Sequence, residues 1–264
     1  MVSTAEQSAL RAVAEEMADA ARVATLRYFR SGKLAVDNKE TDGFDPVTVA
    51  DREAEQAMRA VLAKKRPHDA IFGEEFGHSA GSSGLTWVLD PIDGTRAYIS
   101  GAPSWGVLIG LDNGQGPVLG IVDQPFTGER FFGGFGKADW RRGDQRQAIT
   151  ARRCAALASA TIMTTFPEVG TPDEAAAFAA VSAKCKLTRF GLDCYAYALL
   201  AMGQIDLVIE AGLNAYDVQG PIGLIEGAGG LVTDWQGGPA YQGGQIIAAG
   251  DARVHAAALE ILNR

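Results

Sequence analysis

The sequence predicts a layered α/β or mixed α+β fold, and three observations support that class. Short apolar runs separated by turn residues fill the stretch from residue 70 to residue 132. From residue 160 onward, apolar runs alternate with helical patterns, which is typical of strands layered against helices. The chain of 264 residues is also long enough to bury a large core without disulfides or metal.

The first half of the chain is expected to begin with helices and to continue with strands. Apolar side chains at near-helical spacing predict a long amphipathic helix over residues 3–30, whereas residues 33–48 favour loop or a short strand. A second helix is expected from Asp51 to about Lys65, because Arg66-Pro67 would end it. Strands are then predicted at residues 70–72, 87–89, 105–111, 118–122 and 130–132.

A shift in composition near residue 150 predicts an N-terminal lobe over residues 1–150 and a C-terminal lobe over residues 151–264, joined as one compact catalytic unit. In the second half, strands are expected at residues 160–164, 187–190, 205–210, 231–233 and 246–248. Helices are expected at residues 173–183, 194–202, 217–226 and 251–262.

Charge and cysteine content exclude several classes of function. Lys plus Arg number 24 and Asp plus Glu number 32, so the formal net charge is −8. An acidic chain is a poor generic binder of nucleic acid or anionic membranes, and we expect neither as a partner. The three cysteines show no CxxC spacing, so we expect them to be reduced thiols. We find no signal-peptide core and no long uncharged apolar stretch, and we therefore expect a cytoplasmic protein. The three histidines are scattered and are expected at the surface.

The segment of residues 87–95, WVLDPIDGT, is the most informative in the chain. Asp90 and Asp93 follow a buried strand end across a turn fixed by proline, so both carboxylates and the Ile92 carbonyl can face one point. Mg²⁺ prefers such oxygen ligands, at about 2.0–2.1 Å. Gly94 and Thr95 then open a possible helix, whose N–H groups could receive a phosphate. The alternative is a polar turn in which Asp only caps a helix.

Further carboxylates stand at other predicted element ends. Glu74 follows the apolar run 70–72, although adjacent glutamates are also typical of a solvated loop. Asp51 and Asp217 each open a predicted helix, where either could be only an N-cap. Glu210 ends the strand predicted over residues 205–210.

The ordered set of segments 73–75, 87–95, 216–217 and 226–230 closely resembles the inositol monophosphatase superfamily of Mg²⁺-dependent phosphomonoesterases. The match runs from about residue 39 to residue 233 and so covers most of the chain. The resemblance implies an αβαβα sandwich of the inositol monophosphatase and fructose-1,6-bisphosphatase type, and a homodimer. It also implies two or three Mg²⁺ ions, with Mn²⁺ as a possible substitute.

The resemblance assigns roles to individual residues. Asp51 with Thr95 would orient and deprotonate the attacking water, the Gly94 and Thr95 amides would bind phosphate, and Lys39 would lie near the outer metal. The implied metal ligands are Glu74, Asp90, Asp93, Asp217 and the Ile92 carbonyl. These roles are physically consistent, because carboxylates alone repel a phosphate dianion and divalent ions reverse the local charge. No P-loop motif is present.

Details of the sequence resemble the histidinol-phosphate phosphatase branch of this superfamily. The turn reads DGTR, a Gly-x-Pro-x-Trp follows at residues 101–105, and residues 191–197 read GLDCYAY. The inositol-specific branch typically has DGTTN at the turn and Trp before the later aspartate, where this chain has Tyr216.

The substrate pocket is expected to contain carboxylates that metal does not consume, because histidinol phosphate carries an ammonium group and an imidazole. Asp193 and Glu210 are the candidates, and a carboxylate there favours a cation, typically by 1–3 kcal/mol. Asp193 could instead be an N-cap. Arg96 could bind the phosphate side or pair with a structural acid.

The sequence therefore predicts an Mg²⁺-dependent phosphomonoesterase that hydrolyses L-histidinol phosphate in histidine biosynthesis. The alternatives are an inositol-1-monophosphatase or a broad sugar or nucleotide phosphatase. A non-enzymatic alternative is an interaction protein of nucleic-acid machinery, which the net charge of −8 disfavours.

Overall fold

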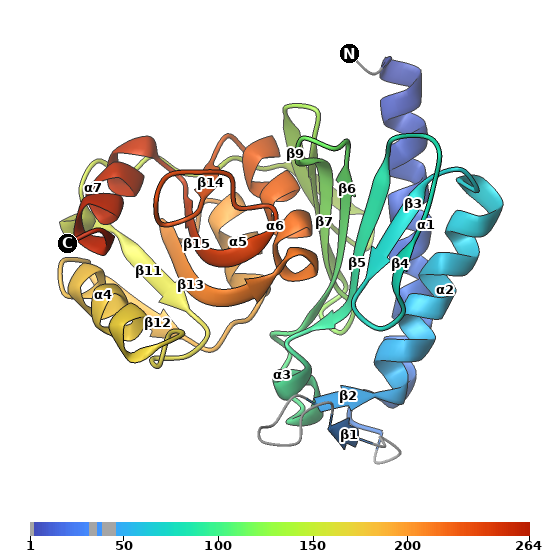
Figure 1. Cartoon of the computed structure of the whole chain (residues 1–264), viewed down its shortest axis with the longest axis horizontal. Helices are drawn as coiled ribbons and strands as arrows, with labels where there is room; N and C mark the ends of the chain where they lie inside the picture. Colours follow the sequence, from blue (N-terminus) through green and yellow to red (C-terminus); the bar gives the residue numbers. More distant parts are fainter. Residues whose placement is uncertain (1–2, 32–35, 39–45) are drawn as a thin grey trace.

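The computed structural model describes residues 3–31, 36–38 and 46–264, and these residues form five layers (Figure 1). Helices α1 (Thr4–Tyr28) and α2 (Val49–Lys65) form the first layer. Both helices have side-chain caps at their N-termini: Ser3 accepts the N–H of Glu6, and Thr48 and Asp51 form a capping box. Their apolar faces pack on the sheet beside them and bury side chains such as Leu10 and Met58.

An eight-stranded sheet forms the second layer. Its order is β10 (Gln145–Ala148), β9 (Lys137–Arg142), β8 (Glu129–Gly134), β7 (Pro117–Gln124), β6 (Gly106–Asp112), β5 (Thr86–Asp93), β3 (Ala70–Gly73) and β4 (Gly77–Ser79). Neighbouring strands are antiparallel except for β3 and β5, which pair in parallel with Gly73 opposite Leu89. The carboxyl ends of β3 and β5 therefore meet at one edge of the sheet, which brings together two of the acidic segments.

Helices α5 (Tyr195–Ala201) and α6 (Ala215–Gly227) form the middle layer. Glycines allow α6 to lie close to the large sheet, since a Cβ on Gly120 would come within 1.9 Å of the Gly220 carbonyl oxygen. One apolar cluster joins α6 to both sheets, with Leu108 on one side and Ile246 on the other. This close packing places the first turn of α6 beside the end of β5.

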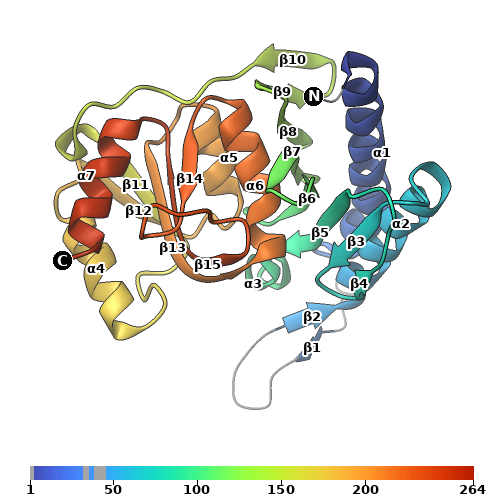
Figure 2. The ribbon, with the colours of Figure 1, turned by 45° about the horizontal axis from the view of Figure 1, so that its top comes forward.

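The five-stranded sheet and two outer helices complete the molecule (Figure 2). The strand order is β12 (Leu187–Phe190), β11 (Thr161–Thr164), β13 (Leu207–Asn214), β15 (Gly243–Ala249) and β14 (Leu231–Thr233). Helices α4 (Pro172–Ser182) and α7 (Ala252–Leu262) cover its outer face. The short elements are β1 (Val36–Asn38), β2 (Pro46–Thr48), α3 (Thr95–Ile99) and a 3₁₀ turn at Leu157–Ser159.

The layered α/β fold and most of the predicted elements are confirmed. Strands β4, β9 and β10 were not predicted, because their residues are largely polar and β10 is exposed along its whole length. The prediction of surface histidines is wrong for His255, which is buried and hydrogen-bonded to Thr233. The large sheet ends at Ala148 and the small one begins at Thr161, on either side of the predicted lobe boundary near residue 150.

Two further observations bear on membranes and thiols. Among the described residues, no helix combines the length and the apolar character needed to cross a membrane. The three cysteines are free thiols, as predicted.

Candidate active site

Three carboxylates from two elements converge at the centre of the molecule. Asp90 and Asp93 lie at the end of β5, and Asp217 lies in the first turn of α6. One carboxylate oxygen of each residue lies within 4.8 Å of the others. The antiparallel register of β5 with β6 shifts between Asp90 and Asp93, and the Ile92 N–H donates to Asp90 Oδ1 at 3.0 Å. This irregularity turns both carboxylates toward α6.

Burial and mutual repulsion govern the electrostatics of this cluster. Asp90 is only 2 % exposed, and burial raises its pKa well above the ordinary value, with further contributions from the charges of Glu74, Asp93 and Asp217. Burial likewise raises the pKa of Asp93. The donor set consists of oxygen atoms, which hard cations such as Mg²⁺ or Mn²⁺ prefer, and a divalent cation would relieve the repulsion. The residues present therefore fit a divalent metal site.

Backbone donors hold all three carboxylates in place, and the donor to Asp90 is the Ile92 N–H described above. Asp217 Oδ2 accepts the Asn214 N–H at 2.6 Å as part of a capping box, and Asp93 Oδ2 accepts the Cys194 N–H at 2.7 Å. Asn214 occupies the N-cap of α6 and Asp217 is its third helical residue, so the interpretation of Asp217 as only an N-cap is wrong, and its capping-box contact coexists with its place in the cluster. Fixed carboxylates of this kind lower the reorganisation that metal binding requires.

Glu74 reaches the same place from the neighbouring strand. It follows β3, and its N–H donates to the Leu89 carbonyl at 3.1 Å, which continues the pairing of β3 with β5. Glu74 lines the central pocket with Asp93, and its charge contributes to the raised pKa of Asp90. The structure thus places Glu74 beside the cluster of the other three predicted carboxylate ligands.

Asp51 and Thr95 make separate hydrogen bonds. Asp51 is 1 % exposed, and its Oδ2 accepts hydrogen bonds from the backbone N–H of Thr48 at 2.8 Å and from the Thr48 hydroxyl. Burial raises the pKa of Asp51 to about 6. The Thr95 hydroxyl donates to the Ile92 carbonyl at 3.0 Å, at the start of α3 and directly after Gly94. The pairing of Asp51 with Thr95 on a water stays a prediction. Lys39 lies outside the described residues.

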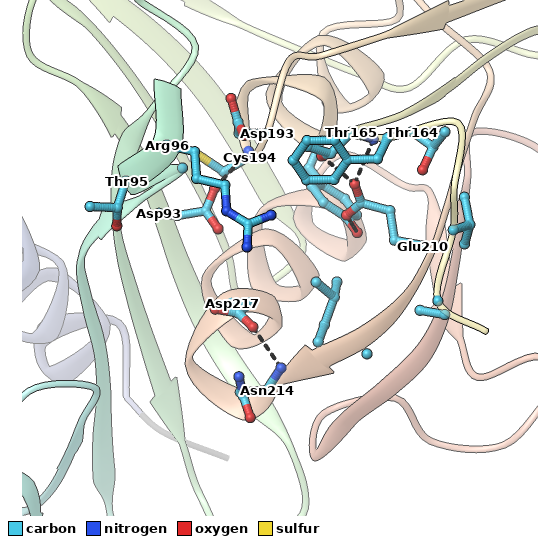
Figure 3. A pocket seen from close by; sticks show the side chains of 18 of the residues that line it. Asp93, Thr95, Arg96, Thr164, Thr165, Asp193, Cys194, Glu210, Asn214 and Asp217 are labelled. Carbon is cyan, nitrogen blue, oxygen red and sulfur yellow. Dashed lines mark hydrogen bonds between the residues drawn. The ribbon is translucent and has the colours of Figure 1, made fainter. Parts of the chain in front are cut away.

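A pocket of about 480 Å³ opens beside the carboxylate cluster (Figure 3). Asp93 and Asp217 line one part of it, and Glu210 and Thr165 line the part formed by the small sheet. All three predicted substrate-binding residues line this pocket: Arg96, Asp193 and Glu210. The metal cluster and the predicted substrate residues therefore border one continuous space.

Glu210 is a buried carboxylate with three donors. It is 7 % exposed, its Oε1 accepts the Thr165 N–H at 3.0 Å and hydroxyl at 2.6 Å, and its Oε2 accepts the Tyr197 hydroxyl at 2.7 Å. Burial raises its pKa above the ordinary value, although these donors favour the ionised form. Because its four lone-pair sites are not all used, Glu210 can accept a further donor from the pocket.

Asp193 does not cap α5, so the N-cap interpretation is wrong. Cys194 occupies the cap position, and the Asp193 side chain accepts the Ser104 hydroxyl at 2.5 Å instead. Burial raises the pKa of Asp193. The Arg96 guanidinium lies over the Phe166 ring, 5.6 Å from its centre, at the wall of the same pocket.

Sequence reasoning missed the hydroxyl groups that hold these carboxylates. Thr165 and Ser104 gave no local signal, because each meets its partner across a long separation along the chain. Tyr197 likewise gave no signal that its hydroxyl donates to Glu210. Thr48 is the exception, because the sequence itself places its hydroxyl three residues before Asp51, which is a capping-box spacing.

Comparison with known proteins agrees with this geometry. The sequence profile of the inositol monophosphatase family matches residues 6–264. The chain belongs to the inositol monophosphatase family. As a member of this family, it is a phosphatase with the family's layered fold, and its substrate is a small phosphate ester.

Relatives within the inositol monophosphatase family differ in named activity. The chain is 40% identical to the chloroplastic bifunctional phosphatase IMPL2 of Arabidopsis thaliana, over 99% of this chain and 77% of that protein. It is 32% identical to a histidinol-phosphatase of Streptomyces coelicolor, over 96% of both chains. The solved structure of an inositol monophosphatase from Zymomonas mobilis matches 100% of both chains, with a TM-score of 0.84 and 38% identity.

Proposed function

We propose that this phosphatase hydrolyses L-histidinol phosphate to L-histidinol and phosphate, in histidine biosynthesis. The observation that carries the proposal is Glu210, a buried carboxylate outside the metal cluster that three donors hold at the wall of the pocket. Asp193 adds a second carboxylate to the same wall. A pocket with this charge favours a leaving group that carries an ammonium and an imidazole over a neutral polyol. The histidinol-phosphatase of Streptomyces coelicolor supports the same substrate.

We further propose that two or three Mg²⁺ ions, replaceable by Mn²⁺, bind at the acidic cluster. The proposed ligands are Glu74, Asp90, Asp93, Asp217 and the Ile92 carbonyl. Bound divalent ions supply the positive charge that a phosphate dianion and a departing alkoxide need among these carboxylates. Lys39 is proposed to lie near the outer ion.

The remaining roles belong to residues around the cluster. We propose that Asp51 accepts the proton of the attacking water, because a pKa of about 6 leaves a carboxylate basic near neutral pH. Thr95 is proposed to orient that water, and the Gly94 and Thr95 amides to bind the phosphate. Arg96 lines the pocket and is proposed to contact the substrate.

A second candidate function is hydrolysis of inositol monophosphate, favoured by the 38% identity to the Zymomonas mobilis inositol monophosphatase. Glu210 and the Thr165 hydroxyl could also accept hydroxyl donors from a polyol. A cytoplasmic location and a homodimer stay predictions, which cell fractionation and analytical ultracentrifugation test.

The deciding experiment measures phosphate release at a fixed Mg²⁺ concentration from L-histidinol phosphate, myo-inositol 1-phosphate, fructose 1,6-bisphosphate and adenosine 3′,5′-bisphosphate. We expect kcat/KM for histidinol phosphate at least a hundredfold above the others, about 2.7 kcal/mol of transition-state discrimination. A preference for inositol phosphate would favour the second candidate, and a flat profile would indicate a general phosphomonoesterase. Release from none of the four would favour the interaction-protein alternative.

A further inference from the structure

Helix α2 carries a second buried carboxylate one turn after Asp51. Glu55 has no exposed surface, and its Oε2 accepts the backbone N–H of Glu75 at 2.7 Å. Its Oε1 accepts the backbone N–H of Phe76 at 3.3 Å and the Nε–H of Arg59 at 2.7 Å. The carboxylate on the helix therefore binds the two residues that follow Glu74.

The strand end before Glu74 rests on the same carboxylate. A Cβ on Gly73 would come within 1.9 Å of Glu55 Oε1, so only glycine permits this approach. Arg59 extends the attachment, because its guanidinium also donates to the Gly77 carbonyl and to the Ser79 hydroxyl at 2.9 Å. The turn from β3 to β4 is thus held to α2 on both sides of Glu74.

This attachment links Glu74 to the rest of the centre. Residues four apart on a helix share one face, so Asp51 and Glu55 project from the same side of α2. Asp51 contributes to the raised pKa of Asp90, and Glu74 contributes to it more strongly. One rigid helix therefore relates the position of Asp51 to that of Glu74.

We propose that Glu55 is a positioning residue that fixes Glu74 against the carboxylate cluster and so sets the affinity for divalent metal. The proposal rests on the metal-ligand role of Glu74 given under the proposed function. Burying a carboxylate is costly unless charged and backbone donors compensate it, and here the compensating N–H groups belong to the turn that presents Glu74. Partners that orient metal ligands commonly contribute ten- to hundredfold in metal affinity.

The test measures Mn²⁺ binding to the metal-free protein by titration calorimetry, without substrate. We expect Glu55→Gln to raise the Mn²⁺ concentration at half-saturation about tenfold or more, because an amide cannot accept from all three donors. Turnover at saturating Mg²⁺ should recover to within about threefold of the unmodified enzyme, since Glu55 does not line the pocket. A residue that only stabilises the fold would lower the melting temperature and leave metal affinity unchanged.

Glu53→Gln is the matched control. Glu53 lies on the same helix, and its carboxylate also accepts hydrogen bonds from side chains. The donors are Arg27 at 2.7 Å and the Tyr28 hydroxyl at 2.8 Å, and both belong to α1. We expect this variant to bind Mn²⁺ within about twofold of the unmodified protein.

The outcomes separate this inference from the proposed function. Equal Mn²⁺ affinity in Glu55→Gln and in the unmodified protein would overturn the positioning role alone. No Mn²⁺ binding by the unmodified protein would overturn the metal centre itself, and the positioning role with it. If Glu55→Gln does not fold, Glu55→Asp keeps the charge but withdraws it by one methylene, and an unchanged affinity in that variant would equally overturn the role.

Discussion

Replacing Asp90 by Asn should stabilise the metal-free protein while removing nearly all turnover. Asp90 is 2 % exposed, and a carboxylate oxygen of each of Asp93 and Asp217 lies within 4.8 Å of it. Asparagine keeps the shape of the side chain and an oxygen that can accept the Ile92 N–H. The substitution therefore removes charge and little else. Turnover should be lost because a central ligand of the proposed metal site becomes neutral.

The magnitude follows from the spacing of the charges. Two unit charges at 4.8 Å repel by about 3.5 kcal/mol at an effective dielectric constant of about 20, and Asp90 faces two such neighbours. The protein does not bear this full repulsion, because the raised pKa of Asp90 means that the carboxyl group takes up a proton first. We expect a net gain of about 2 kcal/mol near neutral pH, which corresponds to a rise in Tm of about 4–8 °C.

The pH dependence gives the gain an electrostatic signature. A carboxyl group whose folded pKa lies above its unfolded pKa destabilises the fold as the pH rises through that interval. The advantage of Asp90→Asn should therefore be small near pH 4, where the unmodified side chain is protonated, and should grow toward neutral pH. Saturating Mg²⁺ should reverse the order, because it stabilises the unmodified protein by mass action, by about 2.7 kcal/mol at 100 times Kd.

The assay is thermal unfolding in chelator from about pH 4 to pH 8, repeated with Mg²⁺. Asp112→Asn is the control, because Asp112 is also buried, on the neighbouring strand β6, but binds the backbone N–H groups of Gly114 and Gly116. It should not raise the Tm at any pH. An unchanged or lower Tm for Asp90→Asn near neutral pH, or a gain that does not vary with pH, would refute the reasoning.

Three other substitutions or measurements test separate parts of the structure. Glu210→Gln should reduce kcat/KM for histidinol phosphate about tenfold more than for glycerol 2-phosphate, and equal losses in the two assays would remove the argument for cation selectivity. Burial alone would raise the pKa of Asp69, but hydrogen bonds from Arg66 and Trp87 lower it. The ionised Asp69 therefore stabilises the fold at neutral pH, and this effect is lost as the pH falls below about 4. Asp69→Asn should lower the free energy of unfolding by about 1–3 kcal/mol at pH 7. Between pH 5 and pH 3, the urea midpoint of this variant should fall less than that of the unmodified protein. Burial raises the pKa of the Cys185 thiol to about 11, so a thiol reagent at pH 8 should label it much more slowly in the folded than in the unfolded chain; equal rates would contradict the burial.

The order of elements and the acidic positions could be predicted because both leave local signals. The run at residues 87–95 shows a buried strand that ends in two aspartates, and the structure places Asp90 and Asp93 at the end of β5. The exposed strand β10 could not be predicted, since each of its residues lies in solvent and no apolar alternation marks it. Local pattern therefore predicted the buried strands better than the sheet edge.

The partners of the site residues depend on long-range packing, and there the sequence was less informative. Ser104 and Asp193 are 89 residues apart in the chain, and Tyr197 on α5 meets Glu210 on β13, so both contacts depend on how separate elements pack together. No spacing rule records such contacts. The capping box of Asp51 is local by contrast, because its partner Thr48 stands three residues earlier in the sequence.

The start of α5 couples the metal cluster to the substrate pocket through consecutive residues. Asp193 adopts a left-handed backbone conformation, with φ of 45°, and the next residue, Cys194, directs its N–H at Asp93. The Asp193 side chain meanwhile accepts the Ser104 hydroxyl at the pocket wall. A non-glycine residue in this conformation carries strain, which the two hydrogen bonds offset. A change of side chain at residue 193 therefore acts on the pocket directly and on Asp93 through the backbone. In a variant of Asp193, metal affinity reports the effect on Asp93, and substrate selectivity reports the effect on the pocket.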